Sequence, residues 1–536
     1  MKIHSEKSLS KDRLQVLPAW LGKIVLYLTG LYLPARIIFL IISVLATGWF
    51  LIRVLPKPGR AAYPCMRIAM PVMSGFFIWL LSVTASWISF KTAWRKMSKS
   101  GYVAFSAYMI IGILFAFVVL TSQPGPARAN VTAWYTNNDP EGTGKGIFPG
   151  RVIWAHYPGT ATWDGNTGYW WEDKYVDQDK TDKLLEKSLS ELTGKDKPGD
   201  VWDAVFTYFN QTKRDLNRGY QAGEKIAVKI NQNNTSGHSS PEEINATPQL
   251  VLSLLKSLVE HACVPEEKIT VFDASRFITD NIYEKCHAVY PQVIFMDNSG
   301  GDGRIRADFV PEAIPYSKDN GKLARGLATC AVEADYLINM ALLKGHVGQG
   351  VTLCAKNFYG VTSIDPDWRK NAHDNFDQNR DGSPRYMTFV DFMGHKDLGQ
   401  KTLLFIVDGI YSNKYVDGKP SFKWNLKPLN NDWPSSIFVS QDMVAVDAVC
   451  TDFILAEWPD APDLQYCDRY LEEAALVSDP PSGTIYDPER DGEAVMGSLG
   501  VFEHWNNPLD KKYTGNLKTG NGIELIYVLC EGKQMR

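Results

Sequence analysis

The sequence predicts an α/β domain, with a mostly parallel sheet and helices on both faces, preceded by three transmembrane helices. Three observations lead to this fold class. The first 121 residues are apolar and basic, the next 29 are rich in Gly, Pro, Asn and Thr, and strand-like runs then alternate with helical patterns. We therefore expect a membrane region over 1–121, a linker over 122–150 and a soluble α/β domain over 151–536.

Three apolar stretches fill the membrane region: Ile37–Ile52, Ala69–Phe90 and Val103–Leu120. A bilayer core requires about 20 helical residues, with roughly 17–25 as the usual range. The second stretch has this length, and the first and third reach it if flanking Arg, Lys and Tyr side chains extend to the interface. The lipid bilayer is therefore one predicted partner.

Positive charge in short loops predicts the orientation of these spans. With three spans, ten cationic residues fall on one side: Lys2, Lys7, Lys11, Arg13, Lys23, Arg36, Lys91, Arg95, Lys96 and Lys99. That side is expected to be cytoplasmic, which places the soluble domain on the periplasmic side of a bacterial inner membrane. A fourth span at Ile24–Leu33 would reverse this orientation, but the stretch has only ten residues and ends at Pro34.

The charge balance differs sharply between the two regions. Residues 1–121 hold 14 Lys and Arg against Glu6 and Asp12, a formal +12, so the remainder of a chain with net charge −4 carries about −16. An acidic domain of this kind argues against nucleic acid as a partner, because phosphate binding requires a positive surface. None of the eight cysteines forms a C-x-x-C pair, which gives no support for a zinc ribbon or an iron–sulfur motif.

Strand-like runs in the soluble domain alternate with helical patterns, which is typical of a largely parallel sheet covered on both faces. The expected strands are Lys225–Asn231, Lys268–Ser275, Val293–Asp297, Tyr336–Met340, Lys401–Ile410 and Ile523–Leu529. The expected helices are Pro248–Ala262, Phe277–Val289 and Leu323–Ala334.

Short polar side chains lie at or near the carboxyl ends of five predicted strands: Asn231, Asp273, Asp297, Asn339 and Asp408. In open α/β sheets, ligands bind outside these ends, where loops and helix N-termini converge. The five residues therefore predict a binding crevice. The alternative is that Asp and Asn follow strands because they favour turns and helix N-caps.

The segment Ala334–His373 contains the densest set of candidate site residues. It provides Lys344, His346, Lys356, Asn357 and His373, around a glycine-rich turn that includes Gly350. Imidazole titrates near neutral pH and ligates metals, and a lysine in such a pocket can hold an anion or form a covalent link. The alternative is a loop with a capped helix and surface lysines.

Several long segments make the chain resemble the domain of unknown function 362 family over most of residues 130–530. They are GIFPGRVIWAHYPGTATWDG (146–165), GEKIAVKINQN (223–233), ADYLINMALLKGHVGQGVTLCAKNFYG (334–360), MGHKDLGQKTLLFIVDGIY (393–411) and SSIFVSQDMVAVDAV (435–449). Many relatives carry cysteine-rich iron–sulfur segments. This chain lacks them, so the resemblance implies no iron–sulfur cluster here.

A second pattern is similar to the lactate racemase family, whose nickel-pincer cofactor is tethered to a lysine. His346, Lys356 and His373 are spaced 10 and 17 residues apart around a glycine-bearing loop. The similarity implies that Lys356 anchors the cofactor, His373 ligates nickel and His346 acts as an acid or base. The sequence departs from that family before the lysine, where Thr352-Leu-Cys-Ala replaces a Gly-Gly pair.

Together these features predict a membrane-anchored enzyme with a transition metal or cofactor, either an isomerase or an oxidoreductase, acting on a small polar ligand. Lys344, His346 and Lys356 are the expected catalytic residues, and His346 and His373 the expected metal ligands. Asn231, Asp273, Gly350, Asn357 and Asp408 are expected to bind the ligand or cofactor. The alternative is a non-catalytic binding or scaffold protein of an envelope complex.

Overall fold

A computed structural model of the 536-residue chain describes residues 84–96, 102–121, 137–318, 323–348, 350–363, 385–464 and 467–531. The contacts divide the chain into two compact units, Met1–Ala133 and Trp134–Arg536. The second unit contains the sheet and all of the candidate site residues that the structure describes.

In the first unit, residues 84–96 are helical and α4 covers Tyr102–Thr121. These helices coincide with the end of the second apolar stretch and with the third one. Within the described part of the chain, no helix is both long enough and apolar enough to cross a membrane. The first stretch lies outside the described residues, and the three-span arrangement stays a prediction.

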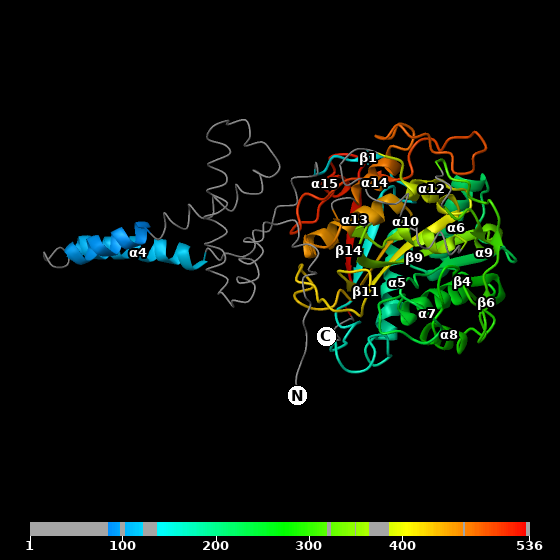
Figure 1. Ribbon diagram of the computed structural model, residues 1–536, viewed down its shortest axis with the longest axis horizontal. Coiled ribbons are helices and arrows are strands. Elements are labelled where there is room, and N and C mark those ends of the chain that lie inside the picture. The colour runs from blue at the N-terminus through cyan, green and yellow to red at the C-terminus, as the bar shows by residue number, and fades with distance from the viewer. Residues whose placement is uncertain are drawn as a thin grey trace, which may run out of the picture. The chain divides into compact units, whose positions relative to one another are not determined.

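A ten-stranded mixed sheet forms the centre of the second unit (Figure 1). All of its main strands run in one direction except β12, which is antiparallel to both neighbours. The order across the sheet is β14 (Glu524–Leu529), β2 (Arg151–His156), β12 (Ser436–Ser440), β11 (Thr402–Asn413), β9 (Tyr336–His346), β3 (Ile226–Lys229), β4 (Ile269–Asp273), β5 (Ile294–Asp297) and β6 (Ile305–Arg306), with β10 (Gly350–Val351) paired to β9. The mostly parallel sheet is confirmed.

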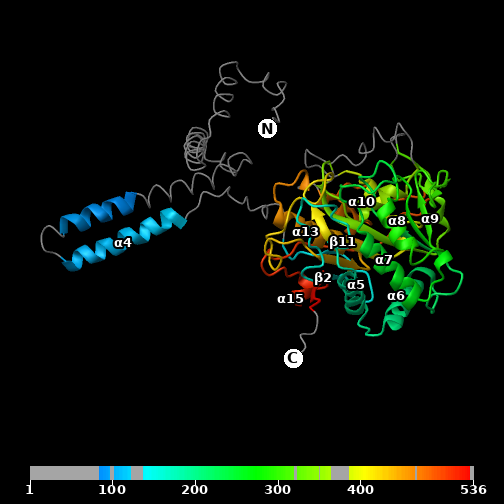
Figure 2. The same cartoon turned by 90° about the horizontal axis from the view of Figure 1, so that it is seen from below.

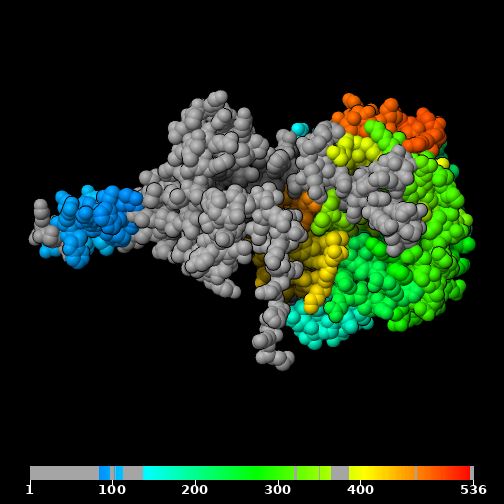
Figure 3. Space-filling view, viewed as in Figure 1, coloured from blue at the N-terminus to red at the C-terminus, as the bar shows by residue number. Residues whose placement is uncertain are grey.

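Helices cover both faces of the sheet, because the strands bury side chains on both sides in alternation (Figure 2). One face carries α5 (Gln178–Thr193), α6 (Pro198–Arg214), α7 (Pro248–Lys256), the π turn η4 (Ser257–His261) and α8 (Asp280–His287). The other face carries α9 (Thr329–Glu333), α10 (Cys354–Asn357), η6 (Phe358–Val361), α12 (Thr388–Gly394), α13 (Met443–Glu457) and α14 (Asp468–Ala475). The segment that directly follows α14 forms the orange surface at the top of the domain in Figure 3.

Smaller elements complete the domain. Two short sheets pair β1 (Glu141–Gly142) with β13 (Val501–Phe502), and β7 (Phe309–Val310) with β8 (Leu327–Ala328). Further short helices are η5 (Glu266–Lys268), η7 (Gly399–Lys401) and α15 (Thr514–Leu517). The expected helix Leu323–Ala334 is shorter than predicted, because its first part pairs as β8 and only Thr329–Glu333 is helical.

Part of the predicted linker packs on the domain. Strand β1 lies within residues 122–150, and the backbone N–H of Lys145 donates to the buried carboxylate of Asp442 at 2.8 Å. The same carboxylate caps α13 by accepting from the N–H of Ala445. The segment after residue 137 is therefore tied to the start of α13.

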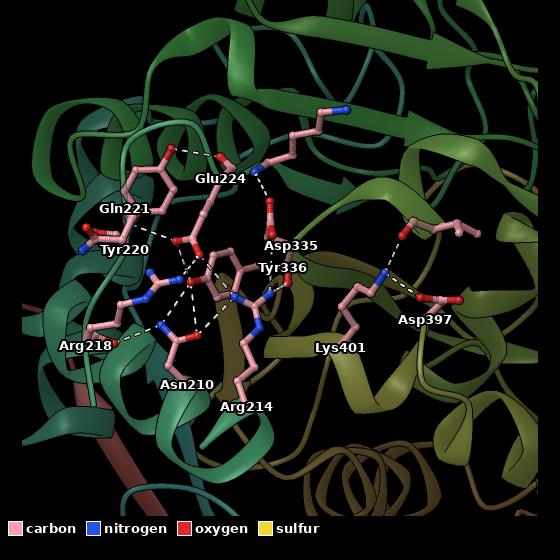
Figure 4. Close-up of polar contacts among 12 residues, drawn as sticks. Asn210, Arg214, Arg218, Tyr220, Gln221, Glu224, Asp335, Tyr336, Asp397 and Lys401 are labelled. Atoms are coloured by element: carbon pink, nitrogen blue, oxygen red, sulfur yellow. Dashed lines mark hydrogen bonds and ion pairs between the residues drawn. The ribbon is translucent and has the colours of Figure 1, made fainter. Parts of the chain in front are cut away.

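A network of hydrogen bonds and ion pairs lies at the amino edge of the sheet (Figure 4). The carboxylate of Glu224 accepts from Arg218 at 2.6 Å, from Arg214 at 3.3 Å and from the hydroxyl of Tyr336 at 2.8 Å. Nδ2 of Asn210 donates a hydrogen bond to the same hydroxyl at 3.0 Å. Because each charge has an opposite partner, this network joins α6 to the start of β9.

Candidate functional site

The carboxyl edge of the sheet holds a buried ion pair at its centre. Nζ of Lys229, the last residue of β3, lies 3.1 Å from Oδ2 of Asp273, the last residue of β4, and both side chains are at most 3% exposed. Asp273 also accepts from the N–H of Gln232 and from the N–H and hydroxyl of Ser275. These hydrogen bonds attach the loops that follow β3 and β4 to the Asp273 carboxylate.

Asn357 connects this ion pair to the neighbouring strand. Its Oδ1 accepts from Lys229 at 3.1 Å and from Asn231 at 3.2 Å, and its Nδ2 donates to Oδ1 of Asn339 at 2.8 Å. Nδ2 also lies within hydrogen-bond distance of the carbonyls of Lys229 and Met340. The structure thus brings together four of the predicted polar residues, Asn231, Asp273, Asn339 and Asn357, around one buried lysine.

The short helix α10 is positioned from both ends. At its start, the carboxylate of Asp447 in α13 accepts from the N–H groups of Cys354 and Ala355 at 2.8 and 3.0 Å. Burial raises the pKa of Asp447 to about 6, although these hydrogen bonds oppose the shift. At its end, Asn357 is bonded to β3 and β9 as described above. Lys356 lies between these two anchors, so its backbone position is fixed.

Lys356 is nine-tenths buried, and its ammonium lies 4.6 Å from the centre of the Tyr359 ring. No described residue accepts a hydrogen bond from this ammonium. Burial lowers the pKa of Lys356 to about 7, with further lowering by the charges of Arg276 and Lys229 against the opposing charge of Asp273. Burial therefore favours the neutral amine of this side chain.

Lys344, near the end of β9, is fully buried, and its one hydrogen bond to a described residue is to the carbonyl of Val416 at 3.1 Å. Burial lowers its pKa to about 7, the charge of Asp417 opposes this, and Lys356 and Arg276 lower it further. The half-buried Arg276 follows β4 and acts on both lysines. Four basic side chains thus lie near this edge, Lys229, Arg276, Lys344 and Lys356, together with the carboxylates of Asp273 and Asp417.

Two glycines allow the site segments to approach each other closely. A Cβ on Gly360 would lie 2.6 Å from Nζ of Lys229 and 2.7 Å from Oδ1 of Asp273. Gly350 has a φ of +77°, and a Cβ there would lie 2.2 Å from Sγ of Cys467. Gly350 therefore serves the packing of the 344–352 hairpin, and Gly360 closes over the ion pair.

Asp408 does not join the cluster, although it was predicted to bind a ligand or cofactor there. Side chains alternate along β11, and this position faces the helix layer opposite α10. Its carboxylate accepts from the N–H of Thr247 at 2.8 Å, at the start of α7, and from the N–H of Ile410. Asp408 therefore has the capping role that was the alternative interpretation of these polar residues.

The structure describes only one of the two histidines that were predicted as metal ligands. His346 ends β9, and its Nδ1 lies 2.5 Å from the carbonyl of Val347 in the adjacent turn. His373 lies outside the described residues. Among the residues that are described, no group of three or more His, Cys, Asp or Glu side chains could hold a metal ion. Convergence of His346, Lys356 and His373 stays a prediction.

Sequence reasoning missed three residues that build the site. Lys229 ends an otherwise apolar strand, Arg276 follows the predicted Asp273 by three residues, and Asp447 interrupts the apolar run of α13. A charged residue inside an apolar strand or helix is a usable signal, because burial of a charge is costly and most buried charges have a partner. The partners themselves come from distant parts of the chain.

Comparison with known proteins gives one family match. Residues 226–452 match the family model described as a domain of unknown function (DUF362). No curated protein and no solved structure matches the chain. The matched range begins at β3 and includes Lys229, Arg276, Lys344 and Lys356. The lysine cluster therefore lies in the part of the chain that matches this family model.

Proposed function

We propose that Arg276, Lys344 and Lys356 bind the carboxylate or phosphate group of a small polar substrate. Two lysines near the same sheet edge are buried and form no ion pair with a carboxylate among the described residues, and this observation carries the proposal. A buried charge without a counter-charge is costly, and a bound anion would compensate it. Asp273 cannot do so, because it is already paired with Lys229.

The same lysines suit proton transfer, so the proposed reaction is of the isomerase type. A general acid or base works best when its pKa lies near the operating pH. The pKa of both Lys344 and Lys356 is lowered to about 7, chiefly by burial. One lysine can then be a base while its neighbour keeps a positive charge for the substrate anion.

Calorimetric titration of the purified full-length protein with malonate and with inorganic phosphate tests the anion site. Removing one charged hydrogen bond costs about 1.5–3 kcal/mol, so Arg276→Gln, Lys344→Met and Lys356→Met should each weaken binding of at least one anion about 10- to 100-fold. The matched control is Lys423→Met, at an exposed ion pair with Asp432, which should leave affinity unchanged. Unchanged affinity in all three site variants would refute the site.

We also propose that residues 1–121 anchor the chain in a bilayer, with the α/β domain on the periplasmic side. The ten cationic residues in the N-terminal tail and the loop before Val103 support this orientation. Alkaline phosphatase, which is active only outside the cytoplasm, should be active when fused after residue 121 and inactive when fused after residue 100. The reverse pattern would support a fourth span at Ile24–Leu33, and release of the chain from membranes by carbonate would refute the anchor.

A further inference from the structure

Lys344 and Lys356 differ in the contacts that their amine groups make. Nζ of Lys344 donates to the carbonyl of Val416, and the side chain has no exposed surface. Lys356 has no such acceptor among the described residues, lies over the Tyr359 ring and keeps 7% of its surface exposed. Of the two amines, that of Lys356 is therefore the one without a hydrogen-bond acceptor among the described residues and with some exposed surface.

The charges around Lys356 favour the reactive form of that amine. Arg276 and Lys229 are the cationic neighbours, and Asp273 is the carboxylate that opposes them. A lysine becomes a nucleophile at neutral pH when an apolar pocket or an adjacent cation holds it neutral. Lys356 meets both conditions, because it is nine-tenths buried and the positive charges of Arg276 and Lys229 act on it, while its cation–π contact with the Tyr359 ring works in the opposite direction.

We propose that the substrate is an aldehyde or ketone that also carries a carboxylate or phosphate group, and that Lys356 forms an imine with its carbonyl carbon. This inference rests on the proposed anion site, because Arg276 and Lys344 would hold the anionic group. It goes beyond that site by naming the electrophile and the bond that forms. It also assigns the two lysines different roles.

The step balances without an oxidant or a reductant. The Nζ lone pair of Lys356 attacks the carbonyl carbon, and the carbonyl oxygen leaves as water with the two protons of the amine. The imine nitrogen then takes one proton from solvent and becomes an iminium, while the Lys344 ammonium keeps its charge for the anionic group. The positive nitrogen acidifies the carbon next to it, which can lose a proton to solvent and give an enamine. Reprotonation at the same carbon restores the iminium, and water then hydrolyses it and frees the Lys356 amine.

Reductive trapping with cyanoborohydride tests the imine directly. The full-length protein is incubated with pyruvate, glyoxylate or glyceraldehyde 3-phosphate, reduced with cyanoborohydride, and digested for peptide mass spectrometry. We expect a reduced adduct on the peptide that contains Lys356, suppressed by excess malonate. Lys356→Met should abolish this adduct, and Lys344→Met should slow its formation about tenfold or more. Lys423→Met should leave its rate unchanged.

The results of the binding and trapping experiments together distinguish failure of the imine from failure of the anion site. Malonate or phosphate binding that depends on Arg276 and Lys344, with no adduct on Lys356 from any of the three carbonyl compounds, would overturn the imine and leave the anion site standing. Loss of both binding and adduct would overturn both. An adduct that malonate does not suppress, or that spreads equally over exposed lysines, would also overturn the imine.

Discussion

Replacing His504 with alanine should lower the free energy of unfolding by about 3–5 kcal/mol, as removal of one partner from a buried ionic cluster usually does. Nδ1 of His504 lies 2.5 Å from Oδ1 of Asp452, and its Nε2 lies 3.3 Å from Oδ1 of Asp468. The His504 and Asp452 side chains are at most 4% exposed. The substitution leaves two carboxylates that have lost their shared cation.

The loss should depend on pH in a defined direction. Burial lowers the pKa of His504, but the charges of Asp452 and Asp468 outweigh this and raise it to about 10. A folded-state pKa above the ordinary value of about 6.5 adds stability that is complete below pH 6.5 and is lost as pH rises through 10. Urea midpoints of wild type and His504→Ala should therefore differ most at pH 6 and converge toward pH 10.5. A difference that grows with pH would contradict the charged state of this imidazole.

Lys229→Met should also lower the free energy of unfolding by about 3–5 kcal/mol, because it leaves the Asp273 carboxylate buried without its cation. The substitution removes three interactions of the ammonium, with Asp273, with the carbonyl of Ile230 and with Asn357. Methionine keeps much of the side-chain volume, so the expected loss comes from charge and hydrogen bonding rather than from a cavity. Urea unfolding of the full-length protein measures it.

A lysine just before the same strand provides the control. Lys225 pairs with Glu333, but these side chains are 52% and 56% exposed, so Lys225→Met should change stability by no more than about 1 kcal/mol. The double variant Lys229→Met/Asp273→Asn should recover part of the loss, because it removes the unpaired charge. Equal effects of Lys225→Met and Lys229→Met would show that the ion pair with Asp273 is not a stabilising element.

Local sequence pattern was sufficient to predict most of the central strands. The strands β3, β4, β5 and β14 fall within the expected ranges, because each is an apolar run bounded by polar or turn residues. β9 extends beyond Met340 to His346, because this part of the chain pairs with β10 and β11. The antiparallel direction of β12 depends on pairing with β2 and β11, and local pattern contains no information on that choice.

The candidate site was predictable in part for the same reason. The carboxyl-edge position of Asn231 and Asp273 follows from strand direction, which the alternating pattern predicts. The position of Asp408 could not be predicted in this way. The face on which a strand-end side chain lies depends on the register of the strand with its neighbours. The partnership of Asp447 with α10 joins residues more than 90 positions apart, and no local pattern indicates it.

Proton uptake on anion binding tests the central claim most directly. Lys344 and Lys356 have pKa values of about 7 in the free protein, so at pH 8 both are largely neutral, and a bound anion raises these values by favouring the charged forms. Titration of malonate, which is fully ionised at pH 8, in two buffers of different ionisation enthalpy at that pH should therefore show net proton uptake, which decreases in Lys344→Met and in Lys356→Met. Binding at pH 8 with no proton uptake would contradict an anion site built from these two lysines.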